Sequence, residues 1–189
     1  MIKRWVQAGA VVLALAAAAP VPPARADDAR FDIKSAYTVL RNGVYYLNAN
    51  MSLVLNSEAA SALNSGVPLV LKINIELTRR RSLMWDATVA ELAQSYRVTY
   101  HALSRRYVVQ NMNSGRKTSY RSWRAAFARL GELSGVPVID ASLLDPEEHY
   151  DISIRALLDV KIIPTGFGLL TSVFYGGDES SDWYEWALR

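Results

Sequence analysis

The chain has 189 residues, with 21 lysines and arginines, 18 aspartates and glutamates, and a formal net charge of +3. It contains no cysteine. A disulfide framework, a thiol nucleophile, a cysteine-ligated metal and the lipid-modified cysteine of a lipoprotein are therefore excluded.

The first 26 residues have the features of an export signal. Lys3 and Arg4 precede an apolar run over 5–19, and Ala24-Arg25-Ala26 has the small-x-small pattern that signal peptidase cuts. A retained membrane anchor is the alternative, but the run is shorter than the ~20 apolar residues that span a bilayer. We therefore expect a periplasmic or secreted mature chain that begins at Asp27.

Cleavage at this point changes the charge of the protein. The mature chain has 18 basic and 18 acidic residues, because Lys3, Arg4 and Arg25 are lost, so its formal net charge is 0. A neutral chain gives no global reason to expect nucleic acid or an anionic membrane as partner. No linker or internal repeat interrupts residues 27–189, which we interpret as a single domain.

Three long segments alternate apolar and polar residues, the pattern of strands with one buried face. They are Val44–Leu55, Leu69–Leu77 and Tyr150–Val160. A first strand is predicted over Phe31–Leu40, joined to the next by a hairpin turn at Asn42-Gly43. Asn56 or Ser57 can cap a short helix that ends near Asn64.

The segment 82–94 is ambiguous. Asp86 could cap a helix, but Leu83, Trp85, Ala87 and Val89 also fall on one face of a strand. We favour a strand that continues from the preceding one. A further strand over Tyr96–Ala102, its hairpin partner over Tyr107–Asn111 and a turn at 113–115 are predicted next.

An amphipathic helix is predicted from Thr118 or Ser119 to Leu130, because Trp123, Phe127 and Leu130 recur at helical spacing. Gly131 or Gly135 would end it. The remaining predicted elements are a short extended segment at Val136–Ile139, a loop at 145–148, a strand at Leu169–Tyr175, a polar loop at Gly176–Asp182 and a final strand at Trp183–Leu188.

The motifs of enzymes are mostly missing. His149 with Glu147, Glu148 and Asp151 could form a metal or acid–base cluster, but a solvated loop before a strand is the better interpretation of so loose a pattern. Gly166-x-Gly168 lacks the third glycine of a dinucleotide-binding loop. A glycosidase-type carboxylate pair stays open, because such pairs meet in space rather than in sequence.

Two groups of residues stand out as possible surfaces. Arg79, Arg80, Arg81, Arg105 and Arg106 lie near aromatic residues and would suit anionic groups, although charges at strand ends also guard sheet edges. Trp183 and Trp186 lie in the last predicted strand and face opposite ways there. That strand is better interpreted as closing the fold than as a binding site.

The run from Tyr96 to Val109 resembles the signature of a proteobacterial family of exported proteins, domain of unknown function 4390. The segments Arg79–Arg81 ahead of Trp85-Asp86, Leu158–Val160 ahead of Pro164, and Ser181–Leu188 also fit this family. Gly166-Phe167-Gly168 departs from it, because members tend to carry a second proline and an arginine there. The resemblance implies no reaction or ligand. The genes of family members often lie near those of a membrane sensor kinase, which hints at a role in envelope sensing.

Together these patterns predict one all-β sandwich of about seven to nine strands with two helices. An immunoglobulin-like topology is one arrangement that such a sandwich could have. As function we expect a non-catalytic binding or interaction module without a cofactor, whose partner is an envelope or membrane protein. A hydrolase of envelope glycans or esters is the alternative, and a structural envelope component is a third class.

Overall fold

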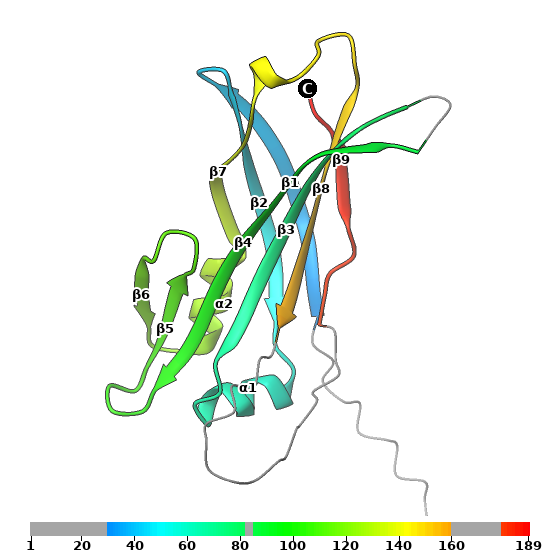
Figure 1. Ribbon diagram of the computed structural model, residues 1–189. Helices are drawn as coiled ribbons and strands as arrows, with labels where there is room; N and C mark the ends of the chain where they lie inside the picture. Colours follow the sequence, from blue (N-terminus) through cyan, green and yellow to red (C-terminus); the bar gives the residue numbers. More distant parts are fainter. Residues whose placement is uncertain (1–29, 82–84, 160–178) are drawn as a thin grey trace, which may run out of the picture.

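Two antiparallel β-sheets form the protein (Figure 1). The computed structural model describes residues 30–81, 85–159 and 179–189. The first sheet has the order β1-β2-β7 and the second the order β6-β5-β4-β3-β8-β9. The strands are β1 (Arg30–Arg41), β2 (Val44–Val54), β3 (Leu69–Arg79), β4 (Ala87–His101), β5 (Arg106–Asn111), β6 (Lys117–Tyr120), β7 (Glu132–Asp140), β8 (Tyr150–Asp159) and β9 (Tyr184–Ala187). The predicted all-β sandwich is confirmed, and its division into three and six strands differs from the four and three of an immunoglobulin constant domain.

The alternation of apolar and polar residues in the sequence corresponds to an alternation of buried and more exposed side chains in the structure. Every second residue of β3, from Leu69 to Leu77, is completely buried, and Ile152, Ile154 and Ala156 of β8 are buried to the same degree. In the facing sheet, Leu47 of β2 is also completely buried, and every second residue after it, up to Leu53, is buried as well. These side chains belong to one core that both sheets share.

The turn and helix signals of the first third are confirmed. Asn42 and Gly43 have φ angles of 49° and 79°, as a tight hairpin between β1 and β2 requires. Helix α1 (Ser57–Asn64) begins after Asn56, whose side-chain oxygen accepts a hydrogen bond of 2.7 Å from the backbone of Ala59.

The strand predicted within 82–94 exists, but it does not continue β3. Strand β4 begins at Ala87, returns antiparallel to β3 and pairs Ala87 with Arg79. It then runs without interruption to His101, so the two strands expected here are one. Because each inward-facing residue of the first half of β4 lies opposite a buried residue of β3, antiparallel pairing preserves the common buried face.

Helix α2 (Trp123–Leu130) begins later than predicted. Thr118 and Ser119 belong to strand β6, where they pair with Val109 and Val108 of β5. The turn at 113–115 therefore closes a second hairpin, and Ser122, not Thr118 or Ser119, caps the helix by accepting a hydrogen bond of 3.2 Å from the backbone of Ala125. Gly131 ends the helix as expected.

The last third agrees with the prediction where it is described. The extended segment at 136–139 is part of the longer strand β7, a short 3-10 helix η1 (Ala141–Leu143) follows it, and residues 145–148 form a loop. Strand β9 pairs with β8 at the edge of the larger sheet. The glycine-rich segment 166–168, the strand expected at 169–175 and the start of the loop at 176–182 lie outside the described residues.

Candidate functional site

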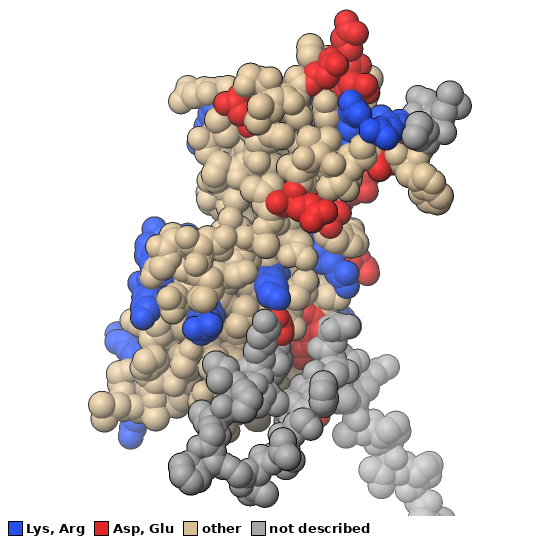
Figure 2. Space-filling view, in the orientation of Figure 1, with Lys and Arg blue, Asp and Glu red and all other residues tan. Residues whose placement is uncertain are grey.

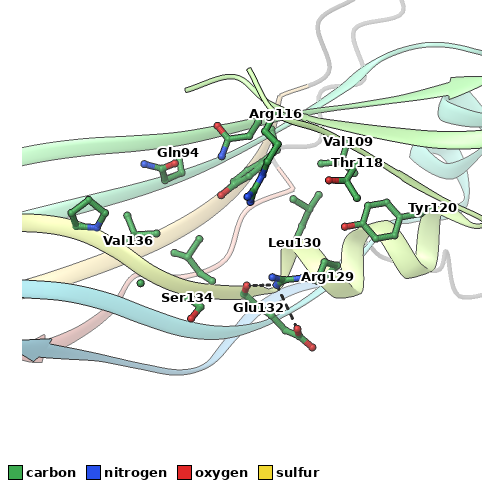
Figure 3. Close-up of a pocket in the computed structure, with 15 residues that line it drawn as sticks. Gln94, Val109, Arg116, Thr118, Tyr120, Arg129, Leu130, Glu132, Ser134 and Val136 are labelled. Carbon is green, nitrogen blue, oxygen red and sulfur yellow. Dashed lines mark hydrogen bonds and ion pairs between the residues drawn. The ribbon is translucent and has the colours of Figure 1, made fainter. Parts of the chain in front are cut away.

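A lateral cleft lies where the β5–β6 hairpin and α2 leave the two sheets apart (Figure 3). Its volume is about 400 Å³. The residues that line it are Gln94 and Tyr96 of β4, Val109 and Asn111 of β5, Arg116, Thr118 and Tyr120 of the β5–β6 hairpin, Arg129 and Leu130 of α2, and 132–137 of β7. Most of these side chains are polar, which is unusual for a space between two sheets.

One wall of the cleft is held in place by a bulge in β7 and by Gly131, the residue before this strand. Asn48 of β2 points its Oδ1 at the bulge of β7 and accepts a hydrogen bond of 3.1 Å from the backbone N–H of Gly135. Gly131 lies so close to β2 that an added Cβ would be 2.2 Å from the carbonyl oxygen of Met51. Its own carbonyl accepts a hydrogen bond of 2.8 Å from the N–H of Met51. A bulge and a close backbone approach thus fix the position of this edge strand.

The opposite wall carries a set of hydrogen-bond donors. The Oδ1 of Asn111 accepts hydrogen bonds from the backbone N–H groups of Asn113 and Ser114, each of 2.9 Å. The side chain of Asn111 also interacts with Tyr96, and this interaction lowers the pKa of the Tyr96 hydroxyl. Because the Oδ1 of Asn111 already accepts two hydrogen bonds, it is not available to accept the hydroxyl proton of Tyr96, which can be donated into the cleft.

Tyr96 is a neutral phenol in this setting. Burial is the largest influence and raises its pKa above the usual value of 10.0, while the charges of Arg116 and Arg129 act in the opposite direction. The raised pKa keeps the proton on the hydroxyl at neutral pH, so Tyr96 stays a donor.

The two arginines of the cleft differ in their partners. Arg129 donates a hydrogen bond of 2.8 Å to the backbone carbonyl of Glu132, and its guanidinium lies 3.5 Å from the carboxylate of the same residue. Arg116 points into the cleft from the other side (Figure 3), and its guanidinium has no carboxylate within 4.0 Å among the described residues. The cleft therefore contains one neutralised and one unneutralised cation.

The surroundings of the cleft are strongly basic. Residues 92–131 contain no aspartate or glutamate but eight basic residues, and we call this stretch the basic segment. Its basic residues are Arg97, Arg105, Arg106, Arg116, Lys117, Arg121, Arg124 and Arg129. The rest of the mature chain has 10 basic and 18 acidic residues, so a net charge of 0 conceals +8 in the basic segment and −8 elsewhere.

This separation of charge is visible on the surface. In Figure 2 the blue side chains are spread over the end that carries β5 and β6, with red side chains prominent at the opposite end. Six of the eight basic residues are exposed, and only Arg129 has a carboxylate within ion-pair distance in the described part of the chain. The net charge of 0 for the mature chain therefore does not describe the local charge at this end of the molecule.

The arginines singled out in the sequence lie at two ends of the larger sheet. Arg79 is the last residue of β3, opposite Ala87, and Arg80 and Arg81 follow it. Arg105 and Arg106 lie at the turn after His101. The fifteen residues of β4 separate the two groups by roughly 45 Å. The structure therefore does not bring them together into one surface.

The first of these groups is engaged by acidic residues. Arg80 binds the carboxylate of Asp151 through both Nε and Nη2, and this hydrogen bond is the main reason that the pKa of Arg80 is raised. The guanidinium of Arg79 lies 3.8 Å from the carboxylate of Glu148. The carboxylate of Asp151 is almost completely buried, which makes this pair a structural contact at the base of the β3–β4 hairpin.

The second group belongs to the basic end. Arg105 is exposed with a φ of 50° in the β4–β5 turn, and Arg106 is half-buried at the start of β5. The rings of Tyr100 and Tyr107 stack beside this turn with centroids 4.9 Å apart. Neither arginine lines the cleft.

The two C-terminal tryptophans face different surroundings. Trp186 packs against the core, and its Nε1 donates a hydrogen bond of 3.4 Å to the hydroxyl of Thr38. Trp183 is 42% exposed and lies under the guanidinium of Arg155 at 5.9 Å. Of the two tryptophans, Trp186 therefore closes the fold and Trp183 presents an aromatic surface.

The acidic residues around His149 have partners of other kinds, since Glu148 and Asp151 face Arg79 and Arg80. Among the described residues, no group of three or more histidines and carboxylates is placed to hold a metal ion. No helix in the same residues is long and apolar enough to cross a membrane.

The fold and the cleft define an all-β protein with a polar cleft between its layers and a basic surface around it. The chain belongs to the family described as domain of unknown function DUF4390, whose model matches residues 28–187. No curated protein and no solved structure matches the chain.

Sequence reasoning missed the cleft because its residues come from five separate segments. One signal was nevertheless present in the sequence, the forty-residue stretch without any acid. A count of charges in windows, rather than over the whole mature chain, would have pointed to Arg116 and Arg129.

Proposed function

We propose that this protein is an exported, non-catalytic interaction module whose basic end docks an acidic face of an envelope protein. The observation that carries the proposal is the separation of charge within a neutral chain, +8 in the basic segment and −8 elsewhere. Charges arranged in this way steer and orient a partner of opposite sign.

Three features support docking at this end. Two of the basic side chains, those of Arg116 and Arg129, line a cleft, so a partner can insert a side chain or chain end between the sheets. Large apolar side chains that are exposed there, Leu103 and Met112, provide contact area beside the charges. Glu132 is the single carboxylate among the described residues that line the cleft, so the cleft lacks the carboxylate pair that glycoside hydrolysis requires.

The proposed location follows from the N-terminal sequence. Lys3, Arg4, the apolar run and Ala24-Arg25-Ala26 favour cleavage after Ala26 and release into the periplasm. A role in sensing at the envelope would require such a location, together with a membrane protein whose exposed face is acidic.

Site-specific photocrosslinking in cells tests this proposal. A photoreactive residue at Ser119, exposed on β6, should crosslink to a discrete protein, whereas one at Leu143, exposed on η1 at the opposite end, should not. The same samples report on export, because the intact mass of the periplasmic protein should correspond to a chain starting at Asp27.

The charge requirement is tested with matched reversals. Lys117→Glu with Arg121→Glu should abolish the crosslink from Ser119, while reversal of two exposed acids in the loop before β8, Glu147→Lys with Asp145→Lys, should leave it unchanged. A crosslink that is equal from both ends, or that survives the first pair of reversals, contradicts the proposal.

A further inference from the structure

The geometry points to a carboxylate-binding site in the lateral cleft, in which the guanidinium of Arg116 and the hydroxyl of Tyr96 hold one carboxylate group of a ligand. This inference rests on the proposed function and gives it a chemical class of ligand. It concerns two donors of the cleft, not the surface charge as a whole.

The first step is the direction of the hydrogen bonds. Asn111 uses its carbonyl oxygen to accept hydrogen bonds from the backbone of Asn113 and Ser114, so this oxygen is not available to the hydroxyl of Tyr96. The hydroxyl proton of Tyr96 is then left for an acceptor in the cleft. A carboxylate is an acceptor only, with two oxygens, and fits this donor.

The second step is the charge. Arg129 is already neutralised by Glu132, so the lining of the cleft carries a net charge of +1 from Arg116. A carboxylate carries one negative charge and two oxygens, which a guanidinium can bind side by side. A phosphate dianion would bring a second charge for which the cleft has no unpaired cation.

The third step is desolvation. Tyr96 is half-buried and its pKa is raised mainly by that burial, so the donor lies in a partly dry wall of the cleft. Hydrogen bonds to a charged group gain strength in such surroundings. The neighbouring Gln94, Thr118 and Ser134 add neutral polar groups that can orient the remainder of a ligand.

A peptide with a free C-terminus and a sugar acid are two classes of ligand that carry a single carboxylate. The test therefore uses the mature protein and two matched pairs of probes, monitored by NMR titration. The peptide pair is N-acetyl-trialanine and its C-terminal amide, whose blocked N-termini carry no charge, and the sugar pair is N-acetylmuramic acid and N-acetylglucosamine. We expect the acid of at least one pair to bind about tenfold more tightly than its neutral counterpart, because a hydrogen-bonded charge is lost in the latter.

Variants assign the binding to the cleft. Arg116→Gln and Tyr96→Phe should each weaken the binding of the carboxylate probe, the first by about tenfold or more. Lys117→Gln is the matched control, because it removes one charge from the adjacent residue, which does not line the cleft. It should change the affinity less than about threefold, as expected for a screened surface charge.

Four results would overturn the inference: no binding of either acid, equal binding of acid and neutral probes, equal losses in Arg116→Gln and Lys117→Gln, or tighter binding of inorganic phosphate than of both acids. If the carboxylate probes fail while the charge-dependent crosslink from Ser119 persists, the docking function stands and the carboxylate site does not. If the crosslink fails while the acid probes bind through Arg116, the docking partner is wrong and the site remains.

Discussion

Strand β3 and the lateral cleft show two different uses of the same two sheets. Strand β3 has a hydrogen-bonded neighbour on each side and buries five side chains completely. The cleft lies beside the edge strands β6 and β7, and most of the side chains that line it are polar. The apolar region stabilises the fold, which leaves the edge region free to carry charged groups that would be costly in the core.

The same contrast separates two arginines. Arg80 is bound by a buried carboxylate at the end of β3, whereas Arg116 reaches into the cleft without an acidic partner in the described part of the chain. Both belong to arginine-containing hairpins in the sequence. Arg80 has a structural role because a counter-charge lies beside it, whereas Arg116 lacks such a partner. The fold decides which of the two arginines has one.

The largest effect is expected in the core of β3. Ile73→Asp places a carboxylate at a completely buried position without a partner, and should cost at least about 4 kcal/mol. Domains of this size have total stabilities of about 5–15 kcal/mol, so the variant should be unfolded or close to it. Chemical denaturation followed by circular dichroism measures the loss.

The neighbouring residue supplies the control. Asn74→Asp changes an outward-facing side chain that lies opposite Arg155 on β8, and should alter stability by less than about 0.5 kcal/mol. Comparable losses in both variants would show that the larger sheet is buried on both faces, and the contrast with the cleft would disappear.

A smaller effect is expected at the C-terminal strand. Trp186→Ala removes a partly buried ring and its hydrogen bond to Thr38, and should cost about 2–3 kcal/mol, below the range of fully buried tryptophans. Trp183→Ala removes an exposed ring and a contact with Arg155, and should cost about 0.5–1 kcal/mol. If thermal melts showed a larger loss for Trp183→Ala than for Trp186→Ala, Trp186 would not be part of the core and the contrast between the two positions would be wrong.

Local patterns were sufficient to predict most of the fold. The alternation in β2, β3 and β8 and the Asn42-Gly43 turn depend on neighbouring residues only, and each was predicted correctly. The start of α2 was not, because Thr118 and Ser119 suit both a helix N-terminus and a strand, and only pairing with β5 decides between them. The cleft could not be predicted at all, since it depends on how far α2 and the β5–β6 hairpin hold the sheets apart.

The smallest effect concerns a carboxyl group at the rim of the core. Glu179 lies next to β8, where its backbone carbonyl accepts a hydrogen bond of 2.8 Å from Leu158. Its Oε2 is buried without a hydrogen-bond partner among the described residues. The pKa of Glu179 is raised from 4.5 to about 7, mainly by burial and also by the charge of Glu58, while a hydrogen bond with Asn56 acts against both.

This raised pKa predicts a dependence of stability on pH. Between pH 4.5 and about 7 the folded protein binds a proton at Glu179 that the unfolded chain has released, so the free energy of unfolding should fall as the pH rises through this interval and level off above it. In Glu179→Gln the side chain does not titrate, and this contribution should vanish. The difference in melting temperature between the parent and the variant, followed over the interval, isolates Glu179 from all other carboxylates. Glu147→Gln, in an exposed loop, is the control and should leave the pH profile unchanged. Parallel pH profiles of the parent and the Glu179→Gln variant would show that water reaches this carboxylate, and that the buried core does not extend to Glu179.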